Sequence, residues 1–259
     1  TLLEIYRELS DSANMMVNFD YLRKERPQDL TLRIDEANTL YKTGNPTRAR
    51  AVLWAGMMAT PPDTKQSNAI SWMFHEYDRA PFTDQQLVQF GKKAPTYALQ
   101  ELGRFYLDSN QPERLTALLG ANTSINAQAL RARAAASTGR DDEALRLVEP
   151  LLRDDVTQCD ALLARASVSL RRNRVDDAVI DAQTAQSQCP QLVAGWSLLA
   201  RAYHAKNNDA GTRRAFEQGT RLNQQNTQLA NEFAAWLLLQ RQPQRAIAAA
   251  RRLVRSAPA

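Results

Sequence analysis

The chain has 259 residues, of which 44% are hydrophobic, and its 33 basic and 28 acidic side chains leave a net charge of +5. Leu- and Ala-rich segments with only nine glycines leave no room for a sheet, and no run approaches the ~18 apolar residues of a membrane span. Most basic residues are arginine, which favours bidentate contact with carboxylate or phosphate. A GC-rich genome would produce the same bias, and the charge is spread along the chain.

Hydrophobic periodicity predicts helices from one end of the chain to the other. Residues 1–9 and 13–24 form a first pair, and 30–41 and 46–58 a second, with a turn at 43–45. Residues 68–79 are apolar on nearly every side, which is typical of a buried helix or of one that covers a partner site. A helix capped at 82–84 runs to about residue 92. The later pairs are 97–108 with 112–119, 126–137 with 141–152, 160–171 with 176–187, 194–206 with 209–222, and 228–239 with 243–255.

Small residues and prolines recur at a fixed interval of 34 residues. One series is Ala144, Ala178, Thr212 and Ala246, and a second is Ala132, Ala166, Ala200 and Ala234. Prolines keep the same interval at Pro27, Pro61 and Pro95, and Pro46, Pro112 and Pro243 fall where a second helix would open.

The repeated unit resembles the tetratricopeptide repeat (TPR), a 34-residue helix–turn–helix with the pattern W-x2-L-G-x2-Y, then A-x3-F, then P. Residues 193–226 match it best, with Trp196, Leu199, Tyr203 and Phe216, but with Ala200 for the glycine, Thr212 for the alanine and Gln224 for the proline. The resemblance implies an all-α fold, a right-handed superhelical TPR solenoid of about seven helix–turn–helix repeats. Its units are 1–29 (partial), 30–63, 64–95 (degenerate), 96–124 (short), 125–158, 159–192, 193–226 and 227–259 (uncapped). The start in mid-unit without methionine indicates a fragment or a processed protein.

The two cysteines fall at opposite ends of one predicted hairpin. Cys159 opens the first helix of its unit and Cys189 ends the second. In an antiparallel hairpin these ends are neighbours, so the Cα atoms can come within the ~7 Å that a disulfide requires. A disulfide indicates an oxidising compartment, above all a bacterial periplasm. Two unrelated buried thiols in a cytosolic protein are the alternative.

In the TPR family the first helices line the concave face of the superhelix. Residues at the corresponding positions are the candidate groove of this chain. Arg104, Arg133 and Arg201 are expected to form a basic column that favours an acidic ligand, although ordinary solvated residues would give the same pattern. The candidate groove residues are Asn38, Tyr41, Trp72, His75, Arg104, Arg133, Ser167, Arg201 and His204.

Motifs for catalysis, metal binding or cofactor binding are missing from the sequence. The two histidines are too far apart for an H-E-x-x-H site, and neither a glycine-rich phosphate loop nor a G-x-S-x-G elbow occurs. An enzyme is therefore not expected, and no cofactor is expected either.

The leading hypothesis is a scaffold for protein–protein interaction in the bacterial envelope, within a secretion, polysaccharide-export or surface-assembly system. Its partner would be a protein or peptide, or an anionic polysaccharide. A cytosolic TPR adaptor or regulator is the alternative. Nucleic-acid binding is disfavoured, because no aromatic-interleaved basic patch is visible. The apolar side chains of the last helix, 243–255, predict association through the C-terminal helix or further repeats beyond it.

Overall fold

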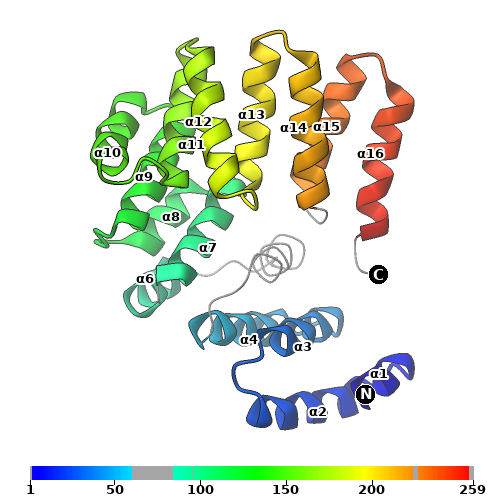
Figure 1. The fold of residues 1–259 in the computed structure, drawn as a ribbon. Helices are drawn as coiled ribbons and strands as arrows, with labels where there is room; N and C mark the ends of the chain where they lie inside the picture. The colour runs from blue at the N-terminus through cyan, green and yellow to red at the C-terminus, as the bar shows by residue number, and fades with distance from the viewer. Residues whose placement is uncertain (1, 60–83, 95, 224–226, 257–259) are drawn as a thin grey trace. The chain divides into compact units, whose positions relative to one another are not determined.

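A computed structural model describes residues 2–59, 84–94, 96–223 and 227–256, and in these ranges the chain forms helices and no strand (Figure 1). The helices belong to two compact units, Thr1–Leu102 and Gly103–Ala259. The predicted all-helical fold, with hairpins that recur at a 34-residue interval, is confirmed. The predicted helix at 68–79, together with Trp72 and His75, lies outside the described residues.

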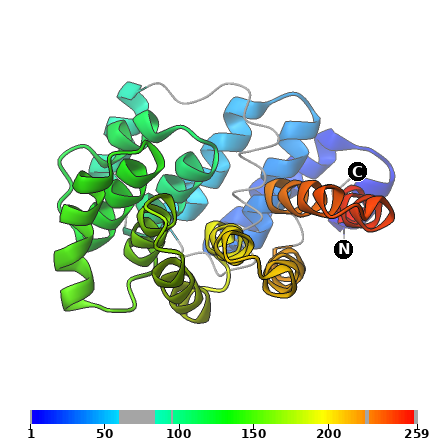
Figure 2. The same cartoon turned by 90° about the horizontal axis from the view of Figure 1, so that it is seen from above.

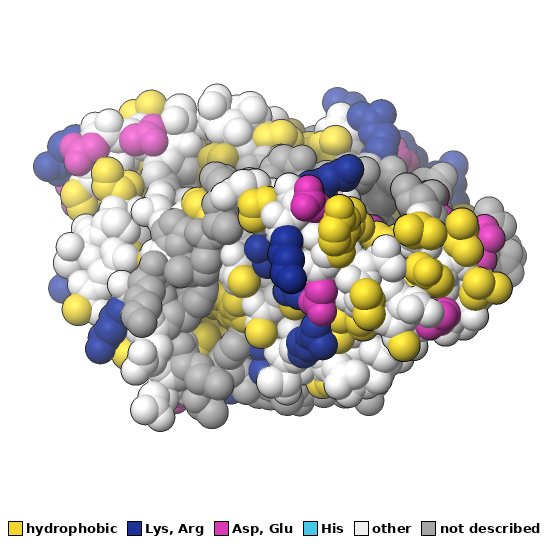
Figure 3. Space-filling model, turned by 90° about the horizontal axis from the view of Figure 1, so that it is seen from below, with side chains coloured by type: hydrophobic (Ala, Val, Ile, Leu, Met, Phe, Trp, Pro, Cys, Tyr) yellow, Lys and Arg dark blue, Asp and Glu magenta, His cyan; other side chains and the backbone are white. Residues whose placement is uncertain are grey.

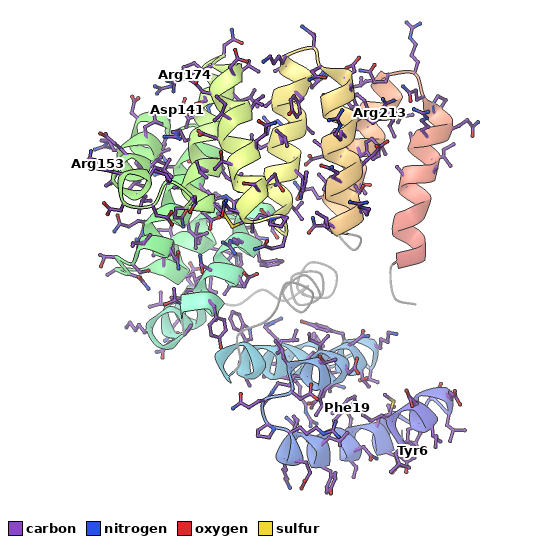
Figure 4. The ribbon with its side chains drawn as sticks, viewed as in Figure 1. Tyr6, Phe19, Asp141, Arg153, Arg174 and Arg213 are labelled. Carbon is purple, nitrogen blue, oxygen red and sulfur yellow. A yellow bond between two sulfur atoms is a disulfide. The ribbon has the colours of Figure 1, made fainter. Side chains whose placement is uncertain are left out.

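The first unit contains two consecutive helical pairs and a small core. Phe19 of α2 is fully buried, and it packs with Met15 and Leu32, against which Tyr6 also lies (Figure 4). The helices α3 and α4 contact each other extensively. The helices of this unit are α1 (Leu2–Glu8), α2 (Ser12–Glu25), α3 (Leu30–Lys42), α4 (Pro46–Ala59), α6 (Asp84–Lys93) and the first half of α7 (Thr96–Asp108).

The second unit is a row of hairpins of nearly constant size, which stand side by side (Figures 1 and 2). From α9 onward the first helices begin at residues 125, 159, 193 and 227 and the second helices at 141, 175, 209 and 243, so both series advance by 34 residues. The helices are α8 (Pro112–Leu119), α9 (Ile125–Ser137), α10 (Asp141–Asp154), α11 (Cys159–Arg171), α12 (Val175–Gln188), α13 (Val193–Ala205), α14 (Asp209–Leu222), α15 (Thr227–Leu239) and α16 (Pro243–Ser256).

Each first helix packs on the second helix of its own hairpin and on the first helix of the next one. The alanines predicted to keep the 34-residue interval lie at these contacts, and Ala132, Ala166 and Ala200 are fully buried. Because an alanine presents only a methyl group, two helix backbones can approach closely there. One continuous apolar core therefore runs from α9 to α16.

The shortened second helix α8 has its own means of ending. Its C-cap, Gly120, adopts a positive φ of 47°. Arg131 of the next helix donates hydrogen bonds to the carbonyl oxygens of Asn122 and Gly120, at 2.5 and 2.6 Å. The guanidinium group thereby satisfies carbonyls at the end of the helix that have no partner within it.

Seven hairpins in the described ranges turn through a residue with positive φ that is the second one after the first helix. It is Ser10 in the α1–α2 hairpin, and in the other six it is Gly44, Asn110, Gly139, Asn173, Asn207 and Arg241. At Gly139 two backbone bonds close the turn, from Arg140 N–H to the Ala135 carbonyl at 2.9 Å and from Gly139 N–H to the Ala136 carbonyl at 3.3 Å. This pair of bonds is a Schellman motif, and it recurs in the other five of these six turns.

Among the six turns that have this motif, Arg241 is the one turn residue that is neither Gly nor Asn. Its replacement by glycine should therefore change the free energy of unfolding. We expect Arg241→Gly to stabilise the protein by about 0.5–1 kcal/mol, because the left-handed conformation costs a residue with a Cβ about 1–2 kcal/mol and the greater freedom of unfolded glycine offsets part of the gain. Urea unfolding of the full chain measures the change.

Gly139→Ala is the matched control for this substitution. A Cβ at Gly139 would meet no atom within 4 Å, so its effect reports only the backbone conformation. We expect it to destabilise the protein by about 1 kcal/mol. Equal effects of the two variants, or a loss of stability in Arg241→Gly, would contradict the role assigned to the turn.

Candidate functional site

Two of the predicted groove arginines meet on a single buried carboxylate, that of Asp160. Arg104 of α7 donates to Oδ2 of Asp160 from Nε at 3.2 Å and from Nη2 at 2.9 Å. Arg133 of α9 donates to Oδ1 of Asp160 at 3.0 Å and reaches Asp108 at 3.3 Å. The cluster of Arg104, Asp108, Arg133 and Asp160, here called the clamp, therefore ties three successive first helices together.

Burial gives the clamp its strength. The Asp160 side chain has no exposed surface, and the side chains of Arg104 and Arg133 are 14% and 10% exposed. Desolvation raises the pKa of Asp160, but the charges and hydrogen bonds of Arg104 and Arg133 outweigh it and hold the pKa below its ordinary value. Asp160 is thus an ionised acceptor whose two oxygens are both engaged.

The disulfide adjoins the clamp. Cys159 immediately precedes Asp160, and it is bonded to Cys189 with the two Cα atoms 6.4 Å apart (Figure 4). The pairing predicted from the hairpin is confirmed. Because the bond joins the start of α11 to the residue that ends α12, it fixes the end of the helix that carries Asp160.

The remaining predicted groove residues differ in exposure. In the first unit Asn38 is partly buried and Tyr41 is buried on α3. In the second unit Ser167 is partly buried on α11, whereas Arg201 and His204 are exposed on α13. The predicted basic column therefore consists of two arginines that share a buried acid and one arginine that faces solvent.

Arg201 has no ion pair within the part of the chain that the structure describes, and the repeat explains the contrast with Arg133. Both arginines hold the same position in their units, two repeats apart. Arg133 meets Asp160, which lies 27 residues later. The residue 27 positions after Arg201 is Gln228, an exposed amide that donates to Glu232 at 3.2 Å. The substitution of an amide for the acid leaves Arg201 uncompensated.

An exposed surface of mixed chemistry covers the first helices α13 and α15, which contact each other. It combines a guanidinium, an imidazole, two amides and an apolar side chain that is 57% exposed, Leu238. We call it the α13–α15 face, and its residues are Arg201, His204, Gln228, Asn231 and Leu238.

A second set of charged contacts lies between hairpins. Asp141 at the start of α10 (Figure 4) accepts from Arg171 at 2.6 Å and from Arg172 at 3.3 Å. The N-cap of α10 is Arg140, which makes no side-chain cap. Hydrogen bonds from Arg171 lower the pKa of Asp141. Arg172 also donates to Asp142 at 2.7 Å, and Lys206 and Asp176 repeat that contact one hairpin later, at 2.5 Å.

Within the described residues there is neither a candidate membrane span nor a candidate metal site. None of the helices there is both long and apolar enough to cross a membrane, and no group of three or more His, Cys, Asp and Glu in those ranges could hold a metal ion. On α16 Ile247 is 45% exposed. Association through this helix stays a prediction.

Comparison with known proteins gives structural likeness without sequence likeness. No protein-family model matches the chain, and no curated protein matches it. Among solved structures, yeast Tom70 covers 93% of this chain and 54% of its own, with 15% identity and a TM-score of 0.49. Human IFIT1, solved as a dimer with m7Gppp-AAAA, covers 99% and 67%, with 12% identity and a TM-score of 0.48. PilW, a type IV pilus biogenesis factor, covers 91% and 95%, with 13% identity and a TM-score of 0.36.

These structures are helical repeat proteins of the TPR type. This chain spans about half the length of the Tom70 chain.

Removal of the Asp160 carboxylate should uncouple three helices. We expect Asp160→Ala to destabilise the second unit by about 3–5 kcal/mol, because two arginines that are largely buried lose their shared acid. Hydrogen exchange of α9 and α11 amides under native conditions measures the loss. The control is Arg153→Ala, whose exposed pair with Glu149 should contribute less than about 1 kcal/mol. A loss in Asp160→Ala no larger than in this control would show that the clamp does not stabilise the unit.

The contribution of Asp160 to the clamp should also depend on pH, and it differs in sign from that of Asp108, whose pKa is raised by burial. The pKa of Asp160 is lower folded than its ordinary value of 3.8, so its contribution is complete above that value and disappears as the pH falls through the folded pKa. The stability difference between the wild type and Asp160→Asn should be constant from pH 7 to about 5 and shrink below about pH 4. A difference that grows on acidification would contradict the assignment.

Proposed function

We propose that this protein is a non-enzymatic scaffold that binds an extended segment of a protein partner on the α13–α15 face. The observation that carries the proposal is the exposed Arg201 of α13, which forms no ion pair in the described residues. It lies on a helix that contacts α15, where the amides of Gln228 and Asn231 are also exposed. Amide side chains can donate to and accept from the backbone of an extended peptide. An exposed guanidinium favours a carboxylate on that peptide. The clamp arginines contribute less to an acidic partner, because Asp160 and Asp108 already pair with them.

The proposal extends to the bacterial envelope, where the scaffold would serve a secretion, polysaccharide-export or surface-assembly system. The disulfide supports an oxidising compartment such as the periplasm, because disulfides of this kind rarely persist in the cytosol. An acidic polysaccharide is an alternative ligand for the same guanidinium. A cytosolic adaptor that uses the same surface is the alternative function, and the redox state of the cysteines distinguishes it.

Substitutions that add or remove a charge on the α13–α15 face test the binding mode. A photo-crosslinking residue in place of His204 should capture a partner in cells. Gln228→Asp should weaken the affinity of that partner about 5- to 10-fold, because it gives Arg201 the acid that Arg133 already has. Arg201→Ala should weaken it similarly and reduce the dependence of affinity on salt. The control is Arg214→Ala, which removes an exposed charge from the neighbouring α14.

The affinities of these variants decide whether Arg201 belongs to the binding site. Affinity that does not respond to ionic strength, or an equal loss in Arg214→Ala, would remove Arg201 from the binding site.

Thiol counting tests the compartment. Protein taken directly from cells, denatured and alkylated without reductant, should show no free thiols, because Cys159 and Cys189 are bonded to each other. Reduction should lower the stability of the folded chain by about 3–4 kcal/mol in the chain-entropy model. Two alkylated thiols in the unreduced sample would favour the cytosolic alternative.

A further inference from the structure

An open surface pocket of about 350 Å³, here called the cavity, lies in the first unit and shares no residue with the α13–α15 face. It is lined by Asp20, Arg23 and Lys24 of α2 and by Arg33 of α3. The volume is at the lower end of the range typical of small-molecule sites. Three of its four lining residues are cationic, so the chemistry of the lining indicates the kind of group that would enter.

The positive charge at this cavity is a local excess. Asp20 forms ion pairs with Arg23 and, at 3.5 Å, with Arg48, while the only further acid in this group of contacts, Glu36, lies 3.1 Å from Arg23. Four cations, Arg23, Lys24, Arg33 and Arg48, therefore face two acids. Residues 1–59 as a whole carry eight basic and eight acidic side chains. The excess thus belongs to the cavity and not to the composition of the unit.

Two of the four cations have no acid bound to them. Within the described residues, the side chain of Arg33 donates a hydrogen bond to the carbonyl oxygen of Pro27 at 3.2 Å and forms no ion pair. Lys24 is exposed and, in the same ranges, forms no ion pair. Figure 3 views the molecule from below and shows Lys and Arg side chains interspersed with hydrophobic and acidic ones on that side. Arg33 and Lys24 are both available to a ligand that enters the cavity.

Behind the lining is a polar layer that lacks hydrogen bonds. Glu36 has no exposed surface, and neither of its carboxylate oxygens has a hydrogen-bond partner in the described part of the chain. Nε of Arg23 is also unpartnered there, because its contact with Glu36 does not have hydrogen-bond geometry. A buried donor without an acceptor is costly, and the charge of the Glu36 carboxylate 3.1 Å away offsets part of that cost.

We propose that this cavity binds an oxyanion group, a carboxylate or a phosphate, through Arg23, Lys24 and Arg33. Guanidinium groups match such oxygens with paired hydrogen bonds, and the lysine adds a mobile positive charge. The site is independent of the proposed scaffold function, because it shares no residue with the α13–α15 face.

The binding should strengthen as the pH falls. The pKa of Glu36 is raised, mainly by burial and also by the nearby charge of Asp20. The positive charges of Arg23, Arg48 and Arg33 lower this pKa but do not outweigh burial. A bound anion adds a further negative charge nearby and raises that pKa again, so binding is accompanied by proton uptake. For an anion whose own charge stays constant, affinity therefore increases as the pH falls towards the pKa of Glu36, because Glu36 is protonated more readily in the complex.

NMR titration of the full chain with inorganic phosphate and with citrate, at constant ionic strength, tests the site. We expect saturable shifts of amides between residues 20 and 36, with a dissociation constant of about 1 mM or lower for one of the two anions. Tighter binding of phosphate would identify a phosphate ligand, and tighter binding of citrate a carboxylate ligand. Shifts that do not saturate with either anion would overturn the proposal.

Variants separate a defined site from general attraction. Arg33→Ala should weaken binding at least fivefold, and Glu36→Gln should retain binding but lose its pH dependence. If Arg33→Ala unfolds the first unit, Lys24→Ala carries the test, because Lys24 is exposed. Arg26→Ala is the control, since it removes an exposed charge two residues away from Lys24. An equal loss in Arg26→Ala and in the lining variants would overturn the proposal.

Discussion

The close approach of successive first helices is the constraint on which the second unit depends. Ala132, Ala166 and Ala200 are fully buried where these helices meet, and 34 residues separate each from the next. A larger side chain at such a contact would typically cost about 1–3 kcal/mol. For the small residues to stay in register, each hairpin must turn at the same place. The left-handed residue after each first helix ensures that it does, and so the unit length is preserved.

That regularity lets one repeat position serve two opposite purposes. Arg133 and Arg201 are equivalent in the repeat, yet the first is 10% exposed as a side chain and the second faces solvent. The neighbouring helix makes the difference, because it presents Asp160 to Arg133 and Gln228 to Arg201. A buried ion pair requires good geometry to offset desolvation, and the fixed helix spacing supplies it at the clamp. Without the acid, the same spacing leaves a cation available to a partner.

Sequence reasoning succeeded where the period itself determines the structure. Helix limits, the turn positions and the pairing of Cys159 with Cys189 all follow from the 34-residue register. It failed where the outcome depends on which side chain the neighbouring unit presents. Nothing in one unit marks Asp160 as the partner of two arginines, because they precede it by 27 and 56 residues. Glu36 was not recognised as a buried acid for the same reason, since its surroundings come from three helices.

The position of the disulfide has a consequence for the clamp. Cys159 holds the first turn of α11 against the end of α12, and Asp160 is the next residue. The covalent bond therefore restricts movement of the carboxylate that Arg104 and Arg133 share. Charge pairs that are largely buried lose most of their benefit when one partner moves, because desolvation remains while attraction falls. Oxidation of the cysteines and formation of the clamp should consequently reinforce each other. The seam between α7, α9 and α11 is then most stable in an oxidising compartment.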